Sequence, residues 1–252
     1  MPNSLTDADL AKRAAAEHAL GQVADGMTVG LGTGSTAAWF VRLLSERISA
    51  DGLSVTGVAT SSTTTWLARD LGVPLKDLDE VSRIDVTVDG ADEVDVDLRL
   101  VKGGGGALLQ EKIVAFASER LLIVADDSKM VAQLGAFPLP VEVVRFGWQT
   151  TLGSVRERVA ELGHRGVRIE PRRSDGELLV TDEGHYILDL HLERIGDPES
   201  LAAVLSSLPG VVEHGLFIGM ASEVIVGRSD GVEVRHRPPR IDVAEAMRSE
   251  DA

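Results

Sequence analysis

Short apolar runs alternate with longer amphipathic segments through the first half of the chain. The runs are rich in Val, Ile and Leu, which is typical of buried strands, whereas apolar residues at every third or fourth position in the longer segments indicate helices. The expected strands are residues 27–31, 55–59, 84–88, 98–101 and 121–125, and the expected helices are 5–24, 35–48, 64–71 and 107–118. This alternation predicts an α/β protein with a Rossmann-like, largely parallel sheet.

A second pattern begins near Pro138-Leu139-Pro140. Its expected elements follow the order β-α-β-β-α-β, which matches the ferredoxin-like α+β plan. Asp182-Glu183-Gly184 is interpreted as the turn of a hairpin between strands 178–180 and 187–190. The other expected elements are strands 141–144, 167–169 and 211–217 and helices 155–162 and 197–208.

These patterns divide the chain into two expected domains. Residues 1–138 form the larger, Rossmann-like catalytic domain, and a hairpin at 224–226 and 232–234 returns to it, so that it includes 221–237 as well. Residues 139–220 form the smaller α+β domain, which is a candidate oligomer interface. The charged segment 238–252 has few apolar residues and is expected to fray.

Composition and charge narrow the classes of function. The chain of 252 residues carries 25 Lys and Arg against 40 Asp and Glu, a formal net charge of −15. Such a protein repels phosphate backbones and anionic lipids, which argues against a general nucleic-acid or membrane binder. The absence of Cys excludes disulfides, a thiolate nucleophile and cysteine-based metal sites. No apolar run reaches membrane-spanning length and the first residues lack a signal-peptide pattern, so we expect a soluble cytoplasmic protein.

The first cluster with candidate chemistry is Gly30-Leu31-Gly32-Thr33-Gly34-Ser35-Thr36, between an expected strand and an expected helix. Glycines, hydroxyls and the free N–H groups of a helix N-terminus together suit a phosphate. The strand 55–59 ends without the acid of a dinucleotide site, and the loop lacks the Lys of a P-loop. A small phosphate ester is therefore favoured over a nucleotide, and a tight turn without a ligand is the alternative.

The second cluster, Asp89-Gly90-Ala91-Asp92-Glu93, directly follows an apolar strand. Ligands of α/β sheets bind at the carboxyl ends of the strands. Two carboxylates there could bind sugar hydroxyls by hydrogen bonds, or one could move a proton. A solvated acidic turn explains the pattern too. A metal site is disfavoured because the spacing is not that of an EF-hand and no His lies nearby in sequence.

The third cluster places four consecutive glycines between Lys102 and the helix that contains Glu111. Such a run is costly in conformational entropy, which indicates a backbone that must approach a ligand or another chain closely. Lys102 supplies a cation beside this loop. On pattern alone, Glu111 is at least as well explained as a surface helix acid.

Together the three clusters resemble the type A ribose-5-phosphate isomerases. The resemblance continues in Ala125-Asp126-Asp127-Ser128-Lys129, in Phe137-Pro138-Leu139-Pro140-Val141-Glu142-Val143, and in shorter motifs at 180–182, 187–189 and 209–212. It covers residues 10–234 in the family's order. One departure is Leu109-Gln110 before Glu111, where many relatives carry Thr-Arg.

The resemblance implies interconversion of ribose 5-phosphate and ribulose 5-phosphate, a step of the non-oxidative pentose phosphate pathway, without a metal or an organic cofactor. Glu111 would be the general base that takes the proton from C2 and returns it at C1 through an enediolate, with a pKa raised toward neutrality by burial. Lys102 and the glycine-loop N–H groups would stabilise the developing negative charge. Asp89 would hold the sugar hydroxyls and help to open the ring or move protons, and Asp92 would orient Lys102 or the substrate.

The resemblance also implies a substrate-binding set drawn from all three clusters. The phosphate would lie on Thr33, Gly34, Ser35 and Thr36, and Lys12 and Lys129 would offset the overall negative charge. The remaining residues of the set are Asp89, Gly90, Ala91, Asp92, Lys102, Gly103, Gly104 and Gly105. A homodimer or homotetramer is expected by the same analogy.

Two other functions remain open on the sequence. One is a sugar-phosphate sensor without catalysis on the same scaffold, although the chain offers no basic DNA-binding module. The other is a coenzyme A transferase-like enzyme with Glu111 as nucleophile, for which the chain is short.

Overall fold

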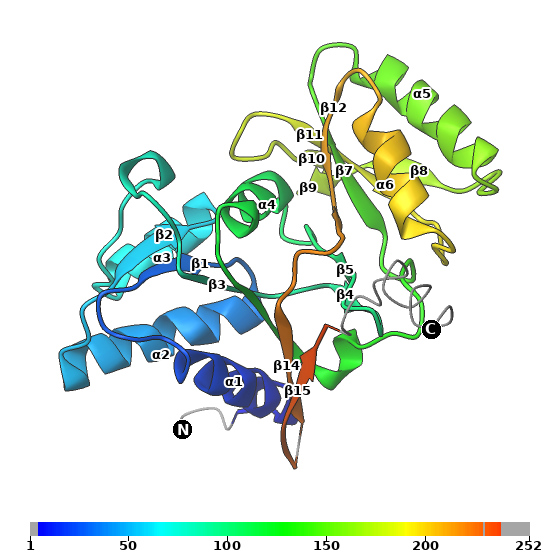
Figure 1. Cartoon of the computed structure of the whole chain (residues 1–252). Coiled ribbons are helices and arrows are strands. Elements are labelled where there is room, and N and C mark those ends of the chain that lie inside the picture. Colours follow the sequence, from blue (N-terminus) through cyan, green and yellow to red (C-terminus); the bar gives the residue numbers. More distant parts are fainter. Residues whose placement is uncertain (1–4, 229, 238–252) are drawn as a thin grey trace, which may run out of the picture.

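The computed structural model describes residues 5–228 and 230–237, so the expected fraying of 238–252 lies outside the described residues. The molecule has a larger sheet with α1, α2 and α3 at one end and a smaller sheet with α5 and α6 at the other (Figure 1). Helix α4 (Leu108–Phe116) lies between them and contacts strands of both sheets. In the described residues, no helix is both long and apolar enough to cross a membrane.

The larger sheet has six strands in the order β15-β14-β6-β3-β1-β2. All neighbouring pairs are parallel except β14 with β15, which confirms the predicted Rossmann-like arrangement. Its strands are β1 (Thr28–Leu31), β2 (Thr56–Ala59), β3 (Val86–Asp89), β6 (Leu121–Asp126), β14 (Glu223–Arg228) and β15 (Gly231–His236).

The side chains of strand β6 show that helices cover both faces of the larger sheet. Successive side chains of a strand point to opposite faces. Leu122 and Val124 join the core beneath α1 and α2, whereas Leu121 and Ile123 pack with Ala115 of α4. The helices on this sheet are α1 (Asp7–Leu20), α2 (Ser35–Asp51) and α3 (Ser62–Asp70). The apolar residues 121–125 of β6 therefore lie between helices on both sides.

The smaller sheet is antiparallel, with the strand order β12-β7-β11-β8. Along the chain the elements follow as β7, α5, β8, β11, α6 and β12, which confirms the ferredoxin-like plan. Their bounds are β7 (Leu139–Val143), α5 (Trp148–Glu161), β8 (Ile169–Pro171), β11 (Tyr186–Leu190), α6 (Pro198–Ser206) and β12 (Val211–His214).

The predicted turn at Asp182-Glu183-Gly184 is present, with the N–H of Thr181 donating to the carbonyl of His185, but the predicted hairpin between its flanking strands is wrong. Strand β10 (Glu177–Leu178) pairs with β9 (Arg173–Ser174), whereas β11 pairs with β7 and β8. The turn that joins β9 to β10 is Asp175-Gly176, where both residues have positive φ, as a two-residue hairpin requires. Pairing in the middle of the smaller sheet lets β11 bury its apolar residues in the core, which a hairpin with β10 would not do.

Several other boundaries differ from the prediction, and two of these differences change an element. Helix α5 begins at Trp148 instead of residue 155, because packing of buried Thr151, Val155 and Val159 stabilises a first turn whose Thr and Gly residues have low helix propensity. The strand expected over 211–217 is two strands, β12 and β13 (Leu216–Phe217), separated by Gly215.

A small sheet of β13, β5 (Leu100–Val101) and β4 (Glu93–Val94) connects the two larger ones. The carbonyl of Gly215 accepts a hydrogen bond of 2.8 Å from the N–H of Lys102. The backbone of Lys102 is thereby fixed at the junction of the two sheets.

Candidate active site

The loops that follow β1 and β3 meet at one edge of the larger sheet. From β1 the chain moves to β2 on one side and then to β3 on the other, so the strand order reverses at this point. Such a reversal opens a crevice at the carboxyl ends of the strands, where α/β sheets bind their ligands. A cavity of about 110 Å³ lies there, lined by Thr33, Gly34, Ser35, Thr36, Gly90, Ala91, Asp92, Lys102, Gly103, Gly104, Gly105, Glu111 and Lys129. The structure thus brings the three sequence clusters together.

One end of the cavity is the N-terminus of α2. Gly34 is the residue before the helix, and its φ of 104° is a conformation that favours glycine. No side chain caps this helix end, so its first N–H groups and positive dipole are available to an anion. Lys12 Nζ lies 3.1 Å from Ser35 Oγ and adds a positive charge, although Lys12 does not line the cavity itself.

The side chain of Thr33 lies in a hydroxyl cluster next to the cavity. Its Oγ1 is 2.8 Å from the hydroxyls of both Thr60 and Ser61 and 3.1 Å from that of Thr64. Thr60 and Thr64 donate in turn to main-chain carbonyls, so the Thr33 hydroxyl donates within this cluster. Thr33 therefore lines the cavity with its hydroxyl hydrogen already engaged.

The other end of the cavity holds one cation between two carboxylates. Lys102 Nζ lies 3.0 Å from Asp89 Oδ2 and 3.2 Å from Glu111 Oε1. Only 2 % of Lys102, 0 % of Asp89 and 4 % of Glu111 is exposed. Lys102 also donates to the carbonyl of Gly90 at 2.6 Å, which fixes its ammonium group.

Burial sets the protonation of this group. Loss of solvent raises the pKa of Glu111 to about 8; Lys102 opposes the shift, and the negative charge of Asp89 adds to it. Burial lowers the pKa of Lys102, but Asp89 and Glu111 raise it further, so the amine stays charged. Glu111 Oε2 has no hydrogen-bond partner in the described residues, which leaves that oxygen free to accept a proton.

Asp89 lies beneath the cavity and does not line it. Its Oδ1 accepts hydrogen bonds from the N–H groups of Thr33 at 3.0 Å and Gly90 at 2.7 Å. Burial raises the pKa of Asp89, and Lys102 and these N–H groups oppose the shift. Asp89 thus joins the loop that follows β1 to Lys102.

Asp92 holds the glycine loop at the rim. Its Oδ2 accepts a hydrogen bond of 2.8 Å from the N–H of Gly104. A Cβ atom at residue 104 would lie 2.5 Å from Asp92 Oδ1, so a side chain there would displace the Asp92 carboxylate from this contact. This contact accounts for one glycine of the run.

The sequence did not identify Arg172, which also contacts this loop. Its guanidinium donates to the carbonyls of Gly103 and Gly104 and pairs with Asp189. A signal existed, since Asp189 interrupts an otherwise apolar strand, and a charge there indicates a buried ion pair.

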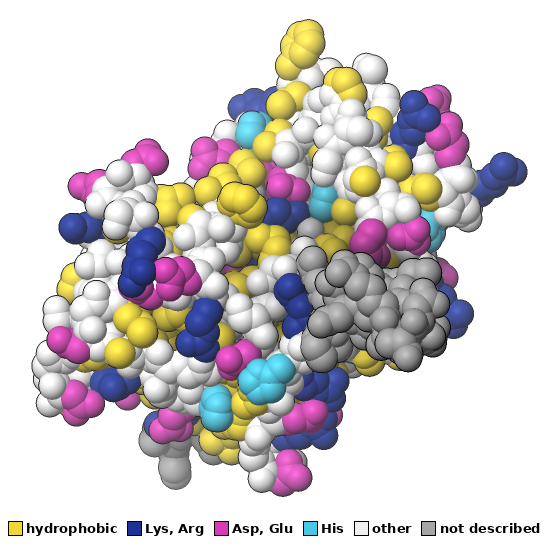
Figure 2. Space-filling model, viewed as in Figure 1, with side chains coloured by type: hydrophobic (Ala, Val, Ile, Leu, Met, Phe, Trp, Pro, Cys, Tyr) yellow, Lys and Arg dark blue, Asp and Glu magenta, His cyan; other side chains and the backbone are white. Residues whose placement is uncertain are grey.

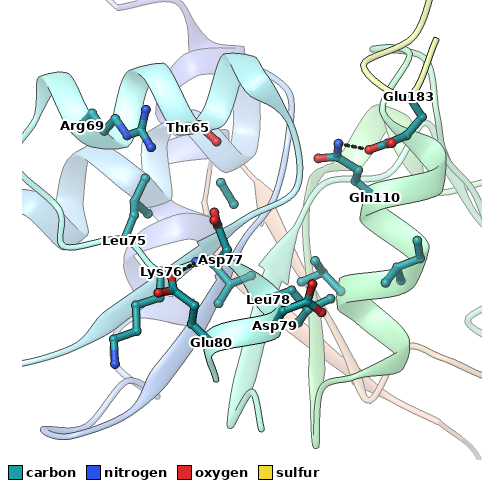
Figure 3. A pocket seen from close by; sticks show the side chains of 14 residues that line it. Thr65, Arg69, Leu75, Lys76, Asp77, Leu78, Asp79, Glu80, Gln110 and Glu183 are labelled. Atoms are coloured by element: carbon teal, nitrogen blue, oxygen red, sulfur yellow. Dashed lines mark hydrogen bonds between the residues drawn. The ribbon is translucent and has the colours of Figure 1, made fainter. Parts of the chain in front are cut away.

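A second cavity, of about 440 Å³, lies between α3, residues 75–80 and α4. Figure 3 shows Gln110 and Glu183 pointing toward one another at its edge, where Gln110 Nε2 donates to Glu183 Oε1 at 2.6 Å. None of the residues in the predicted catalytic set lines it. The departure Leu109-Gln110 therefore places Gln110 in a contact outside the group around Lys102. In the described part of the chain, no cluster of three or more His, Asp or Glu side chains could hold a metal ion.

Comparison with known proteins points to one family. The model of the family "Ribose 5-phosphate isomerase A (phosphoriboisomerase A)" matches residues 56–231. The ribose-5-phosphate isomerase A of Dinoroseobacter shibae is 55 % identical over 236 residues, which is 93 % of this chain and 91 % of that protein. The structure of ribose 5-phosphate isomerase A from Methanocaldococcus jannaschii superimposes with a TM-score of 0.83 at 38 % identity, over 90 % of this chain and 98 % of that one. A structure of D-ribose-5-phosphate isomerase in complex with phospho-erythronic acid gives a TM-score of 0.84 at 37 % identity, over 92 % of this chain and 100 % of that one.

Proposed function

The chain belongs to the ribose 5-phosphate isomerase A family and is an isomerase that interconverts D-ribose 5-phosphate and D-ribulose 5-phosphate; on that premise we propose that Glu111 is its general base. The observation that carries the proposal is the position of Glu111, buried 3.2 Å from Lys102 in the same cavity as the uncapped end of α2. A carboxylate whose pKa is about 8 can both take and return a proton near neutral pH.

The phosphate of the open-chain sugar lies at the N-terminus of α2, and the sugar extends toward Glu111. The N–H groups of Gly34, Ser35 and Thr36 bind the phosphate, and Lys12 and Lys129 balance its charge. Glu111 then removes the proton from C2, and the electron pair of the C–H bond forms the C1–C2 double bond of an enediolate. The same carboxyl returns the proton at C1, while a proton moves from O2 to O1, which gives the ketose.

Lys102 stabilises the negative charge that develops on the sugar oxygens. The ammonium group is already fixed and free of bulk water, so it needs no reorganisation during the reaction. We expected Asp89 to hold the sugar hydroxyls, but it lies beneath the cavity. Its proposed role is therefore to orient Lys102, and that of Asp92 is to hold the glycine loop.

The same arrangement fits phospho-erythronic acid, which a related isomerase binds. Its carboxylate spreads negative charge over two oxygens, as an enediolate does. We expect this compound to inhibit the present enzyme competitively. Binding should weaken about a hundredfold when Lys102 is replaced by Met, because the cation that faces the two oxygens is lost.

Turnover of ribose 5-phosphate by EDTA-treated enzyme tests the proposal. Glu111→Gln keeps the size of the side chain and removes the base, so kcat should fall by about a thousandfold or more. Glu119→Gln, at an exposed acid, is the matched control and should behave like the parent. A folded Glu111→Gln variant with parental kcat would refute the role of Glu111, and a parent that needs a metal would refute the metal-free mechanism.

The domain division and the assembly belong to the same proposal. We assign residues 1–138 and 221–237 to the catalytic domain and 139–220 to a domain that contributes to a homodimer or homotetramer. Phe146 in the smaller domain is 94 % exposed, and hydrophobic side chains gather over α4 (Figure 2), where Ile113 and Phe116 are exposed. A sizing column should give a multiple of 26.8 kDa, and a monomer at micromolar concentration would contradict the assembly.

We place the enzyme in the cytoplasm. Substrate and product are charged phosphate esters, which do not cross a lipid bilayer unaided. Cell fractionation should recover the isomerase activity with the cytoplasmic fraction.

A further inference from the structure

One side chain of the smaller sheet reaches the glycine loop of the active site. Arg172 follows β8, and its Nη1 donates to the carbonyl oxygens of Gly103 at 2.7 Å and Gly104 at 3.1 Å. Its Nε donates to Asp189 Oδ2 at 2.9 Å, and its Nη2 pairs with the other oxygen of that carboxylate. The guanidinium is therefore held from both sides, by β11 and by the loop.

These contacts fix the direction of the loop's N–H groups. In a trans peptide the carbonyl and the following N–H point to opposite sides, and the described residues contain no cis peptide. Carbonyls held by Arg172 therefore turn the N–H groups of Gly104 and Gly105 away from Arg172. The N–H of Gly104 donates to Asp92. The N–H of Gly105 has no acceptor among the described residues, and Gly105 lines the cavity.

We propose that Arg172 is a positioning residue of the reaction, which holds the Gly103–Gly105 backbone so that the N–H of Gly105 faces the substrate oxygens beside Lys102. This inference rests on the proposed function, because the N–H of Gly105 would help to stabilise the negative charge of the enediolate. Four successive glycines have little conformational preference of their own, so the loop needs an external contact to keep one geometry. Arg172 provides that contact without touching the substrate.

The role depends on the shape of the guanidinium as much as on its charge. Asp189 already balances the positive charge of Arg172. Only a planar group with several donors can donate hydrogen bonds to a carboxylate and two carbonyls at the same time. A Lys at this position keeps the charge but cannot make all of these contacts. Loss of the geometry should therefore lower the rate even when the charge is kept.

The effect should fall on kcat more than on KM. The phosphate lies at α2, and Arg172 makes no hydrogen bond or ion pair there among the described residues. An N–H that points at the enediolate stabilises the transition state more than the bound sugar. We expect Arg172→Ala to lower kcat about 10- to 100-fold and to change KM less than about threefold.

The test compares Arg172→Ala and Arg172→Lys with Arg173→Ala. Arg173 is the neighbouring arginine, whose guanidinium donates to Gly176 within the exposed β9–β10 hairpin, so its variant should match the parent. Guanidinium chloride at millimolar concentration should restore part of the kcat of Arg172→Ala, and it should not restore Glu111→Gln. Arg172→Lys should stay well below the parent.

Each outcome separates this inference from the proposed function. Parental kcat in Arg172→Ala, or a loss confined to KM, would overturn the positioning role while the parent remains an isomerase. A parent without isomerase activity would overturn the proposed function itself. If Arg172→Ala does not fold, Asp189→Asn carries the same test, because it releases the guanidinium from one side and should lower kcat with KM unchanged.

Discussion

Lys102 Nζ lies 3.2 Å from Glu111 Oε1 at a place where both side chains are almost wholly shielded from water. Glu111 is in the first turn of α4, where the positive end of the helix dipole also favours its ionised form. Burial opposes that form more strongly, so the pKa of Glu111 rises to about 8. A base poised near neutral pH thus follows from burial next to one cation.

The pH dependence of catalysis should report this pKa. Only the ionised form of Glu111 accepts the proton from C2, so kcat/KM should rise with pH and level off above about 8. At lower pH it should fall about tenfold per unit. Steady-state rates in buffers of constant ionic strength measure the profile. A flat profile between pH 6 and 9 would contradict the assignment.

Stability should vary with pH in the opposite direction. The pKa of Glu111 is about 8 in the folded protein against 4.5 for an ordinary Glu. Between these values the folded state keeps a proton that the unfolded chain releases, so the contribution of Glu111 to the free energy of unfolding falls as the pH rises. Glu111→Gln lacks this dependence.

Thermal unfolding of the parent and of Glu111→Gln at two pH values checks this. The variant should gain several degrees in Tm relative to the parent on going from pH 5 to pH 9. An equal difference at both pH values would show that the folded protein does not shift this pKa.

Removal of the cation should damage both activity and stability. Lys102→Met leaves Asp89 and Glu111 buried without a positive partner, which should cost about 3 kcal/mol of unfolding free energy. The rate should fall about a hundredfold or more, since the enediolate charge loses its main partner. Urea unfolding and steady-state kinetics measure the two effects. Lys76→Met, at an exposed lysine, is the control, and equal behaviour of the two variants would refute the role of Lys102.

Lys12 should act on binding instead of chemistry. It contacts Ser35 at the N-terminus of α2, where we propose that the phosphate binds, at the opposite end of the sugar from the reacting carbons. Lys12→Ala should raise KM about tenfold with little change in kcat, because the phosphate is bound equally in the ground state and the transition state. Arg13→Ala, at the exposed neighbour, should leave KM unchanged. A fall in kcat alone would contradict this assignment.

Local patterns were sufficient to predict the larger sheet and the residues around the cavity. Strands β1, β3 and β6 are short and rich in apolar residues, and the glycine and acid clusters follow β1 and β3 directly, so their positions needed no knowledge of distant contacts. The resemblance to a family then supplied a role for Glu111, which pattern alone could not separate from a surface acid.

Features that depend on distant contacts were missed. Arg172 contacts a loop 68 or 69 residues earlier in the chain; the charge of Asp189 indicates an ion pair within the smaller sheet, but no local pattern indicates the contact with the loop. The hairpin prediction failed because burial in the smaller sheet, not the turn signal at Asp182-Glu183-Gly184, decides the partner of β11. The hydroxyl cluster of Thr33 with Thr60, Ser61 and Thr64 likewise joins separate segments of the chain, and no local pattern indicates it.

The most direct test of the account is the fate of hydrogen at C1 of the product. Ribose 5-phosphate is converted in D₂O, and the ribulose 5-phosphate is analysed by NMR after a single turnover. Transfer through Glu111 puts deuterium at C1 in every turnover in which the carboxyl exchanges its proton with solvent before returning it, and Glu111→Gln should give neither product nor label. Deuterium at C1 in product formed by a folded Glu111→Gln variant would show that another group carries the proton and would contradict the central claim.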